Sequence, residues 1–482
     1  MKVLVTNPPW SGVGYGARSD VRWPHKRKDK YIEYPIYLSY TVAVLEEAGF
    51  EVSFIDAIME ELDIPAFTQA VREINPDLLV MECSTPSIRH DLQSAAAVKS
   101  ALPNTKIALV GSHVTFFHQD ILAENPSVDA ICRGEFEITV RELARAIAEG
   151  RDWNTVEGLS YQEDGRILVT PDRPLIEDLD SLPFPAWHIV RVDGYRAAIY
   201  SGRKPTAMVS SRGCPYHCTY CLWPNTLYGH RFRARSAKNV VDEIEQAVKQ
   251  YGIDEIYFDD DTFTMDKKRV LEICRLMQER GLRVPWICQA RVDTVDRETL
   301  LEMKEAGCHY ILFGVESGSP EMLKIMKKRI TLDQAREAFR LCNEVGIKTQ
   351  AFFLFGIPGE TQETIRQTIE FAKELEASST QFAVAIPHPG SVLYEQCVQN
   401  NWLVYNDWED FASCEALIET PQLSREEVEK ARIRAYREYY FRPKYIVREA
   451  LRVRHPRDVL RLVRGAMSVL ARLSFFQSAR SA

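Results

Sequence analysis

Hydrophobic residues in the first 150 positions form short runs separated by stretches with helical periodicity. The runs are VLVTN, EVSFID, LLVMEC, IALVG and AICRG, and the stretches between them include residues 35–48 and 90–101. Apolar runs of strand length that alternate with amphipathic helices are typical of a parallel, doubly wound sheet. The sequence therefore predicts a Rossmann-like α/β domain over residues 1–150.

A second alternating series begins near residue 204. Its six runs are AMVSS, EIYFD, WICQA, YILFG, TQAFFLF and TQFAVAI, and helical stretches such as 237–251 and 332–345 separate most of them. Six such units predict a partial (β/α)6 barrel over residues 204–395, since a closed barrel has eight. The remaining residues, 396–482, are predicted to be helical.

Residues 151–203 join the two series. Glu163, Asp164 and Gly165 form a turn signal that predicts a hairpin, and the segment DLDSLPFPAWHIV follows it. Because the two prolines of this segment cannot donate ladder hydrogen bonds, we expect an extended linker there.

Composition narrows the class of protein. The chain has 482 residues, of which 45% are hydrophobic and 27% charged, so it is long enough for two or three domains with cores of their own. We find no signal segment and no apolar run of membrane-spanning length, so a cytoplasmic protein is expected. Eleven cysteines, an odd number, indicate reduced thiols and a metal or redox role for any tight cluster.

Three cysteines cluster directly after the first strand of the second series. Residues 211–224 read SRGCPYHCTYCLWP, which places Cys214, Cys218 and Cys221 on one loop at the end of the barrel where active sites lie. Three thiolates on an iron–sulfur cubane, where four are usual, leave one iron open to a small molecule with adjacent amine and carboxylate groups. A zinc site completed by His217 or a remote cysteine is the alternative. Six further cysteines are isolated and expected to be buried apolar residues, at positions 274, 288, 308, 342, 397 and 414.

The Cys-x3-Cys-x2-Cys spacing resembles the signature of the radical S-adenosylmethionine (SAM) enzymes. In that family the amino-acid end of SAM fills the open corner of a [4Fe-4S] cluster, and an electron from the cluster splits the sulfonium to give a deoxyadenosyl radical. The resemblance implies a [4Fe-4S] cluster held by the three cysteines, bound SAM, and an external one-electron donor of the flavodoxin or ferredoxin type.

Further stretches resemble motifs of the same family, in the family's order along the barrel. GVESG resembles the ribose motif, FGIPGE resembles the motif that packs against adenine, and FDDDTF stands where the family contacts the amine of SAM. FDDDTF departs from the common Gly-Gly-Glu form, which leaves open which aspartate makes the contact. Arg291 is placed to pair with the carboxylate of SAM. The SAM-binding residues that the resemblance implies are Asp259, Asp260, Asp261, Gln289, Arg291, Gly314, Glu316, Gly356 and Pro358.

The first domain resembles the cobalamin-binding domain of one large radical SAM subfamily. NPPW, CSTPS, GSHVTFF and CRGEFE follow predicted strands, at the edge where doubly wound sheets bind ligands. The Asp-x-His-x-x-Gly motif is absent, so we expect no imidazole from this domain on the lower face of cobalt. A structural domain, or one for another nucleotide, is the alternative. The cobalamin-binding candidates are Asn7, Pro8, Pro9, Ser84, Thr85, Gly111, Ser112, His113 and Gly134.

Two charged segments remain. Residues 14–35 are too long and charged for a tight turn, which predicts a lid over the corrin or substrate, or a solvated insertion. Residues 441–482 carry ten Lys and Arg against two acidic residues, a charge of +8, which leaves −16 for the rest of the chain. This basic amphipathic tail suits either peripheral contact with an anionic membrane or a helix packed on the barrel. The acidic remainder disfavours nucleic acid.

Three functions are compatible with the sequence. The first is a cobalamin-dependent radical SAM enzyme that removes hydrogen from an unactivated carbon and transfers methyl from methylcobalamin; ring formation or carbon–carbon bond formation is its variant. CLWPNTLYGHRFRARS resembles the hopanoid-associated and porphyrin-ring-forming members, which suggests a lipid-like, tetrapyrrole-like or other small substrate. The second is a tRNA methylthiotransferase, which needs three more cysteines where the first domain has Cys83 and Cys132. The third is a non-catalytic metal-bound scaffold.

Overall fold

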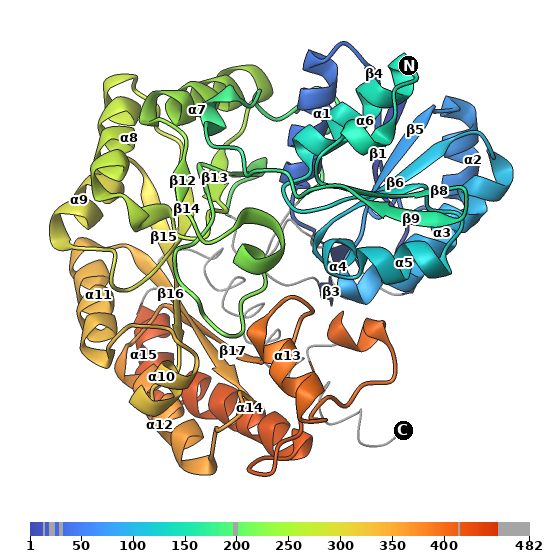
Figure 1. Cartoon of the computed structure of the whole chain (residues 1–482). Helices are drawn as coiled ribbons and strands as arrows, with labels where there is room; N and C mark the ends of the chain where they lie inside the picture. The colour runs from blue at the N-terminus through green and yellow to red at the C-terminus, as the bar shows by residue number, and fades with distance from the viewer. Residues whose placement is uncertain (13–14, 19–24, 28–31, 196–200, 413–414, 452–482) are drawn as a thin grey trace.

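The structure is a computed structural model of the whole chain, and it describes residues 1–12, 15–18, 25–27, 32–195, 201–412 and 415–451. Two α/β units lie side by side, and the C-terminal helices lie against the second unit and below the first in the view of Figure 1. No helix in the described part of the chain has the length and apolarity needed to cross a membrane.

The first unit is a seven-stranded sheet with the strand order β4-β1-β5-β6-β7-β8-β9. Its first five strands are parallel, as the hydrophobic runs predict, and the predicted hairpin β8–β9 adds two antiparallel strands to the edge formed by β7. The strands are β1 (Lys2–Asn7), β4 (Glu51–Asp56), β5 (Leu78–Glu82), β6 (Lys106–Val110), β7 (Ala130–Cys132), β8 (Leu159–Glu163) and β9 (Arg166–Val169). The helices are α1 (Ile36–Glu47), α2 (Ile64–Ile74), α3 (Ile88–Ala101), α4 (Ser112–Phe116), α5 (His118–Glu124) and α6 (Glu137–Glu149), with a 3-10 turn η1 (Thr85–Ser87) before α3.

The second unit is a six-stranded, all-parallel sheet in sequence order, an open barrel rather than a closed one. The strands are β10 (Pro205–Met208), β13 (Glu255–Phe258), β14 (Trp286–Ala290), β15 (Cys308–Glu316), β16 (Lys348–Phe355) and β17 (Ser379–Val384). The helices that cover it are α7 (Ala237–Tyr251), α8 (Lys267–Glu279), α9 (Arg297–Glu305), α10 (Pro320–Ile325), α11 (Leu332–Val345) and α12 (Gln362–Glu374).

Short elements complete the chain. The first-unit loop after β1 forms the ribbon β2 (Tyr15–Ala17) and β3 (His25–Arg27), and the cysteine loop lies between β11 (Ser211–Arg212) and β12 (Arg233–Ala234) and contains the π-helix η4 (Pro224–Tyr228). Further 3-10 turns are η2 (Trp153–Thr155), η3 (Leu179–Ser181) and η5 (Phe263–Met265). The C-terminal region has α13 (Val392–Gln399), η6 (Trp408–Ala412), α14 (Arg425–Tyr440) and α15 (Pro443–Leu451).

Local sequence signals account for the barrel helices. Hydroxyl or carboxylate side chains accept hydrogen bonds from the first turns of α7, α8, α9 and α11, which satisfies amide groups that have no partner within the helix. α7 and α11 then end at Gly252 and Gly346, each in the left-handed conformation that glycine adopts without strain. These signals explain why both helices have the bounds that the sequence predicts.

Helix α1 joins the two units. Its residues from Ile36 to Leu45 are all buried, which is typical of a helix covered on every side. One apolar core runs through it, from the strands of the first sheet to Val209 and Trp223 of the barrel unit. The two units therefore share a core, and the carboxyl ends of both sheets are held at a fixed place relative to each other.

Candidate functional site

The cysteine loop is fixed at several points. Gly213 has φ +84°, and a Cβ there would lie 2.2 Å from the carbonyl oxygen of Arg231, so only glycine fits this turn. The amide of Thr219 donates to the carbonyl of Met326 at 3.1 Å, and the carbonyl of Thr219 accepts from the amide of Leu393 at 2.8 Å. The loop is thus attached to the end of α10 and the start of α13.

The three predicted cluster ligands differ from the other cysteines. Cys214, Cys218 and Cys221 are partly exposed, whereas the other described cysteines are buried. This confirms the prediction for positions 274, 288, 308, 342 and 397; Cys414 lies outside the described residues. Within the described residues, no three His, Cys, Asp or Glu side chains come together tightly enough to hold one metal ion. Three partly exposed thiols on one loop are the donor set that a [4Fe-4S] cluster with one open corner needs. The residues therefore fit that group.

Glu316, the predicted ribose contact, lies beside the cysteine loop. It follows a register shift at the end of β15 and has φ +71°, a conformation that is uncommon for a residue with a side chain. Its Oε1 is 2.9 Å from Nζ of Lys328, and that ammonium is 3.4 Å from Oη of Tyr220, next to Cys221. Burial raises the pKa of the Tyr220 hydroxyl, and the neighbouring Cys218 raises this pKa further. The structure therefore brings Glu316 and the cysteines together.

Lys328 is a site residue that the sequence analysis missed. It lies in the charged stretch Lys327-Lys328-Arg329, where Lys327 and Arg329 both have left-handed backbone, at φ 52° and 56°. Lys328 is buried while its two neighbours are exposed. Three consecutive cations give no sequence signal for which one turns inward, so only the tertiary structure identifies it.

Arg291, the predicted partner of the SAM carboxylate, makes internal contacts. Its Nε and Nη2 each lie 2.9 Å from an oxygen of Asp293, and Nη2 also donates to the carbonyl of Lys328 at 3.0 Å. Its guanidinium lies 3.4 Å from the ring centre of Tyr216, within the cysteine loop. These contacts hold Arg291 against the loop, and the assignment to the SAM carboxylate stays a prediction.

The three aspartates after β13 point in different directions. Asp260 is fully buried and accepts from the amide of Ser210 at 2.7 Å and from the hydroxyl of Ser211 at 2.8 Å, so it supports the backbone before the cysteine loop. Asp259 accepts from Nε2 of Gln289 at 3.1 Å. Asp259 and Asp261 line a small pocket, together with Tyr37, Ser211, Arg212, Trp223 and Tyr228. Of the three, Asp259 and Asp261 are therefore the candidates for contact with a ligand.

The glycine-rich motifs serve two kinds of contact. A Cβ on Gly314 would lie 2.4 Å from Oε1 of Glu316, so this glycine leaves room for the Glu316–Lys328 pair. Gly356, with φ +86°, donates its amide to Oε2 of Glu360 at 2.5 Å, which closes the turn that carries Pro358. Burial raises the pKa of Glu360 to about 8.

The carboxyl edge of the first sheet gathers most of the predicted cobalamin-binding residues. Asn7 ends β1 and Pro8 and Pro9 follow it, Ser84 and Thr85 follow β5, and residues 111–113 follow β6. Gly111 has φ +116°, and a Cβ there would lie 2.2 Å from the carbonyl oxygen of Cys83, directly after the neighbouring strand β5. Gly134, after β7, donates its amide to Oγ1 of Thr115 at 3.1 Å. This cradle of small and polar side chains fits the corrin site that the resemblance implies.

Arg18, from the loop predicted as a lid, closes part of this edge. Its side chain is fully buried and lies 2.6 Å from Asp91, donates to the carbonyl of Pro8 at 3.0 Å and also bonds Asn7. Burial raises the pKa of Asp91, while the charge of Arg18 opposes that rise. Sequence reasoning missed Arg18 because nothing local marks one arginine in a loop rich in charges. The loop therefore covers this edge through Arg18. Residues 14, 19–24 and 28–31 of the predicted lid lie outside the described residues.

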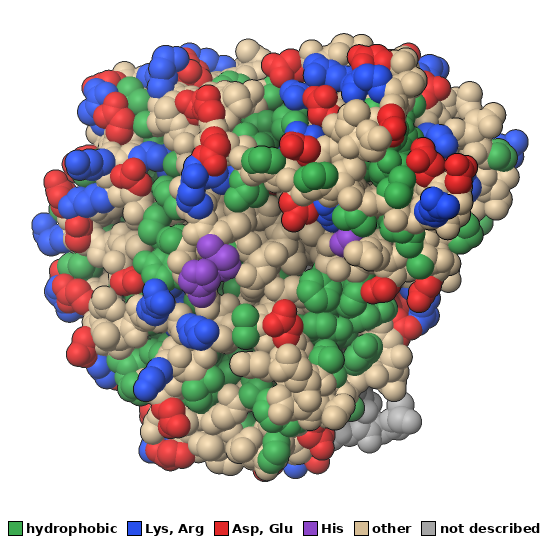
Figure 2. Space-filling model, in the orientation of Figure 1, with side chains coloured by type: hydrophobic (Ala, Val, Ile, Leu, Met, Phe, Trp, Pro, Cys, Tyr) green, Lys and Arg blue, Asp and Glu red, His purple; other side chains and the backbone are tan. Residues whose placement is uncertain are grey.

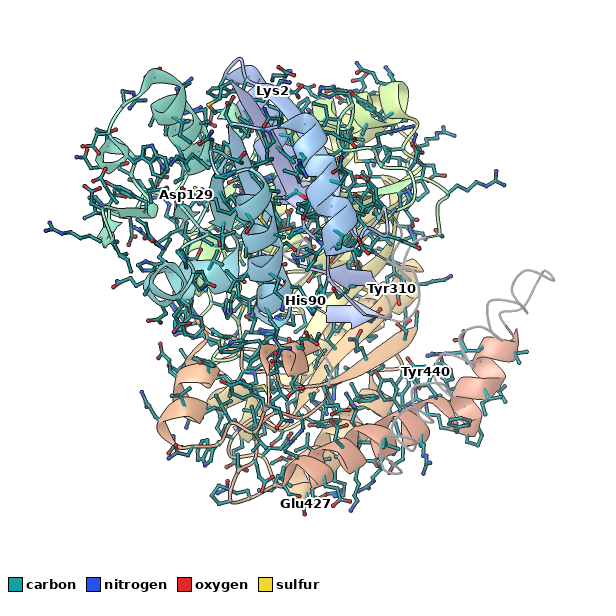
Figure 3. All side chains as sticks on the ribbon, turned by 90° about the vertical axis from the view of Figure 1, so that its right-hand side faces the viewer. Lys2, His90, Asp129, Tyr310, Glu427 and Tyr440 are labelled. Atoms are coloured by element: carbon teal, nitrogen blue, oxygen red, sulfur yellow. The ribbon has the colours of Figure 1, made fainter. Side chains whose placement is uncertain are left out.

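Residues 405–412, which we call the C-terminal strap, cover the same edge from the other side. His113 bonds Oγ1 of Thr85 at 3.1 Å, and its ring centre is 5.1 Å from that of Trp408. Nε2 of His90 lies 2.6 Å from Oε1 of Glu409. In Figure 3, His90 is at the lower end of the first unit, directly above the C-terminal elements. Burial lowers the pKa of His113 to about 3, so its ring is neutral.

A buried charge cluster of Glu135, Glu137, Arg212 and Arg233 crosses between the units. Arg212, two residues before Cys214, lies 2.8 Å from Glu135 and 2.7 Å from Glu137, while Arg233 lies 2.8 Å from the other oxygen of Glu135. All four side chains are 3% exposed or less. Glu135 and Glu137 belong to the CRGEFE stretch. Their carboxylates bind Arg212 and Arg233, which flank the cysteine loop, and do not face the predicted corrin site.

Comparison with known proteins identifies both units. The model of the radical SAM superfamily matches residues 208–372, and that of the B12 binding domain matches residues 26–144. The chain is 33% identical to an uncharacterized methyltransferase of Pyrococcus horikoshii over 90% of this chain and 94% of that one. It is 30% identical to the anaerobic magnesium-protoporphyrin IX monomethyl ester cyclase of Rubrivivax gelatinosus, over 82% of this chain and 70% of that one.

Solved structures support the same arrangement of units. The radical SAM methyltransferase TsrM of Kitasatospora setae, solved with cobalamin and a [4Fe-4S] cluster, matches 82% of this chain and 75% of its own at a TM-score of 0.65 and 22% identity. A likeness at this identity shows the fold. The cysteine loop and the cradle at the first sheet's edge agree with these matches. The chain therefore belongs to the radical SAM superfamily, with a cobalamin-binding domain before its barrel, and its cofactors are a [4Fe-4S] cluster, SAM and cobalamin.

Proposed function

We propose that this enzyme transfers a methyl group to an unactivated carbon of a small, lipid-like or tetrapyrrole-like substrate. When bound, the cluster and SAM supply a deoxyadenosyl radical that removes hydrogen from that carbon, and methylcobalamin supplies the methyl group. The observation that carries the proposal is that the cysteine loop and the first sheet's carboxyl edge meet. The π-helix η4, which begins three residues after Cys221, packs against α4, which follows Gly111.

In this proposal the chain's own residues have distinct tasks. Cys214, Cys218 and Cys221 hold the cluster, and Asp259 or Asp261 accepts hydrogen bonds from the amine of SAM. Glu316 accepts from ribose hydroxyls, which requires its pairing with Lys328 to loosen or to be shared.

Deoxyadenosine release tests the radical step. Anaerobically reconstituted protein is mixed with SAM and dithionite, and deoxyadenosine is measured by mass spectrometry. We expect release from the wild type and from Cys274→Ala, a matched change at a buried cysteine on helix α8, and none from Cys214→Ala. Release that persists in Cys214→Ala would contradict the assignment of the cluster ligands.

Methyl-labelled SAM tests the transfer step. Metabolites and lipids of cells with and without the gene are compared by mass, and the candidate substrate is then incubated with the enzyme and SAM that carries a deuterated methyl group. A product heavier by one labelled methyl group supports the proposal.

Ring formation is the second candidate, because a cyclase is among the relatives that span most of the chain. It predicts a product that has lost hydrogen and carries no label. The same measurement therefore decides between the two functions.

We also infer contact of the C-terminal region with an anionic membrane. Phe441, Ile446, Val447 and Leu451 are exposed, by 51–78%, on the end of α14 and on α15. Two predicted tail cations, Lys444 and Arg448, instead bond Glu376 and the backbone beside it, so α15 packs on the barrel through its basic side. Cosedimentation with vesicles of anionic phospholipid tests this, and loss of binding in Ile446→Ser/Val447→Ser is expected; wild-type protein that stays in solution would contradict it.

A further inference from the structure

The surface beside the cysteine loop carries positive charges that form no ion pair with the part of the chain that the structure describes. Lys324, Lys327 and Arg329 are exposed, and none of them is in an ion pair with a residue that the structure describes. On the neighbouring helices α11 and α12 the exposed arginines are paired with carboxylates, at Arg336, Arg340 and Arg366. Three cations without an ion-pair partner among the described residues therefore lie within six positions of one another, on a chain whose net charge is −8.

The cations are directly next to the predicted cluster ligands. The sulfur of Cys218 is 4.0 Å from the backbone carbonyl oxygen of Lys327. His217, between two of the cysteines, is exposed and stacks on His230 with 3.9 Å between the ring centres. We call Lys324, Lys327, Arg329, His217 and His230 the basic rim. Figure 2 shows two adjacent histidine side chains on this face with Lys and Arg side chains gathered below them.

The backbone directs these charges outward. Because Lys327 and Arg329 both adopt left-handed φ values, the turn sends Lys328 inward to Glu316 and its two neighbours into solvent. Acidic groups near the rim are otherwise engaged: Glu316 with Lys328 and Asp293 with Arg291. Glu321, at the start of α10, is the exposed carboxylate on that short helix. The rim therefore takes its positive charge from Lys324, Lys327 and Arg329, and it lies beside the partly exposed thiol of Cys218.

We propose that the basic rim is the docking surface for an acidic one-electron carrier protein of the flavodoxin or ferredoxin class. This inference rests on the proposed function, because only a cluster held by this loop needs an electron there. The reduced carrier loses one electron and the cluster gains it, and no covalent bond forms or breaks. Opposite charges on two such surfaces speed association and fix the orientation of the partners, while the cluster loop stays at the contact.

Charge reversal tests the docking surface without touching the cluster ligands. The variant Lys327→Glu/Arg329→Glu reverses two rim charges. The matched control is Arg72→Glu/Arg283→Glu. It reverses two exposed arginines in the last turn of α2 and just before β14, at the opposite edges of the sheets, and neither is in an ion pair with a described residue. Circular dichroism and melting temperature establish that all three proteins are equally folded.

The first readout is binding of oxidised flavodoxin to the reconstituted enzyme, measured by calorimetry at low and high salt. We expect the rim variant to bind at least about tenfold more weakly than wild type at low salt, the control to stay within about twofold, and the difference to shrink as salt rises. Equal binding by wild type and rim variant would overturn the proposal. Equal rim dependence for anionic vesicles or an oligonucleotide would also overturn it, because it would show a general anion surface.

The second readout separates docking from chemistry. With dithionite, a small reductant, the rim variant should release deoxyadenosine at the wild-type rate; with reduced flavodoxin its rate should fall by about tenfold or more. Loss of release with both reductants would show that the rim serves the cluster instead, and would overturn the proposal. Absence of release from the wild type with dithionite would refute the proposed function, while the binding readout would still decide the docking surface.

Discussion

Removal of one charge from the buried cluster between the two units is expected to loosen their interface. Glu135 lies 2.8 Å from both Arg212 and Arg233, and it accepts from the amide of Ile176 at 2.8 Å. Glu135→Gln keeps the shape of the side chain but leaves two arginines to share Glu137. Because one buried cation then has no counter-ion, we expect a loss of about 3–5 kcal/mol.

The matched control is Glu149→Gln at the end of helix α6, which begins two residues after Glu135. Glu149 is 56% exposed and pairs with Arg151 at 2.5 Å, a surface pair worth less than about 1 kcal/mol. A second variant, Glu135→Gln/Arg233→Met, also removes the cation that lost its partner and should recover part of the loss. Recovery would show that the unpaired charge, rather than a change of packing, causes the destabilisation.

Hydrogen–deuterium exchange of the peptides around residues 133–137 and 209–213 measures the opening of this interface. A loss of about 3–5 kcal/mol corresponds to exchange about a hundredfold or more faster in Glu135→Gln. An effect no larger than that of Glu149→Gln would refute the reasoning, because it would show that the four charges are solvated or compensated in another way.

Three further changes have defined outcomes. Gly318→Ala should lower the melting temperature, because the new Cβ would lie 2.5 Å from Cβ of Phe371 on α12; an unchanged melting temperature would show that α12 can shift. Glu360→Gln should flatten the pH dependence of stability: burial raises the folded-state pKa of Glu360 to about 8, so its contribution is complete below pH 4.5 and is lost as pH rises through about 8. The variant should then be more stable than wild type above pH 8, and parallel melting curves would contradict this. His388→Phe should raise the melting temperature, because both ring nitrogens are buried without a partner among the described residues; a fall would reveal a polar partner for the ring.

Much of the architecture follows from the sequence because its signals are local. Alternating apolar runs and amphipathic stretches predict both parallel sheets, and α7 and α11 have the predicted bounds since a cap residue and a glycine delimit each. The hairpin around Asp164 is also present, although its pairing with the first sheet is a tertiary contact that no local pattern encodes.

The site is predicted less completely, for a physical reason. The cysteine loop and Glu316 are marked by motifs, and the structure places them together. Lys328 and Arg18 carry no such mark, because burial of one cation among several is decided by partners far along the chain. Asp260 shows the converse: its motif suggests a ligand contact, yet it supports the backbone through Ser210 and Ser211.

The C-terminal strap has a consequence for how the protein is made. Glu409 reaches His90 across 319 positions of sequence, and at about 5–20 residues per second the ribosome needs about 16–64 seconds to span them. During that interval the first domain can fold while its ligand edge is still uncovered on one side. The bulky corrin can therefore enter before residues 405–412, which are synthesised later, cover this side of the edge.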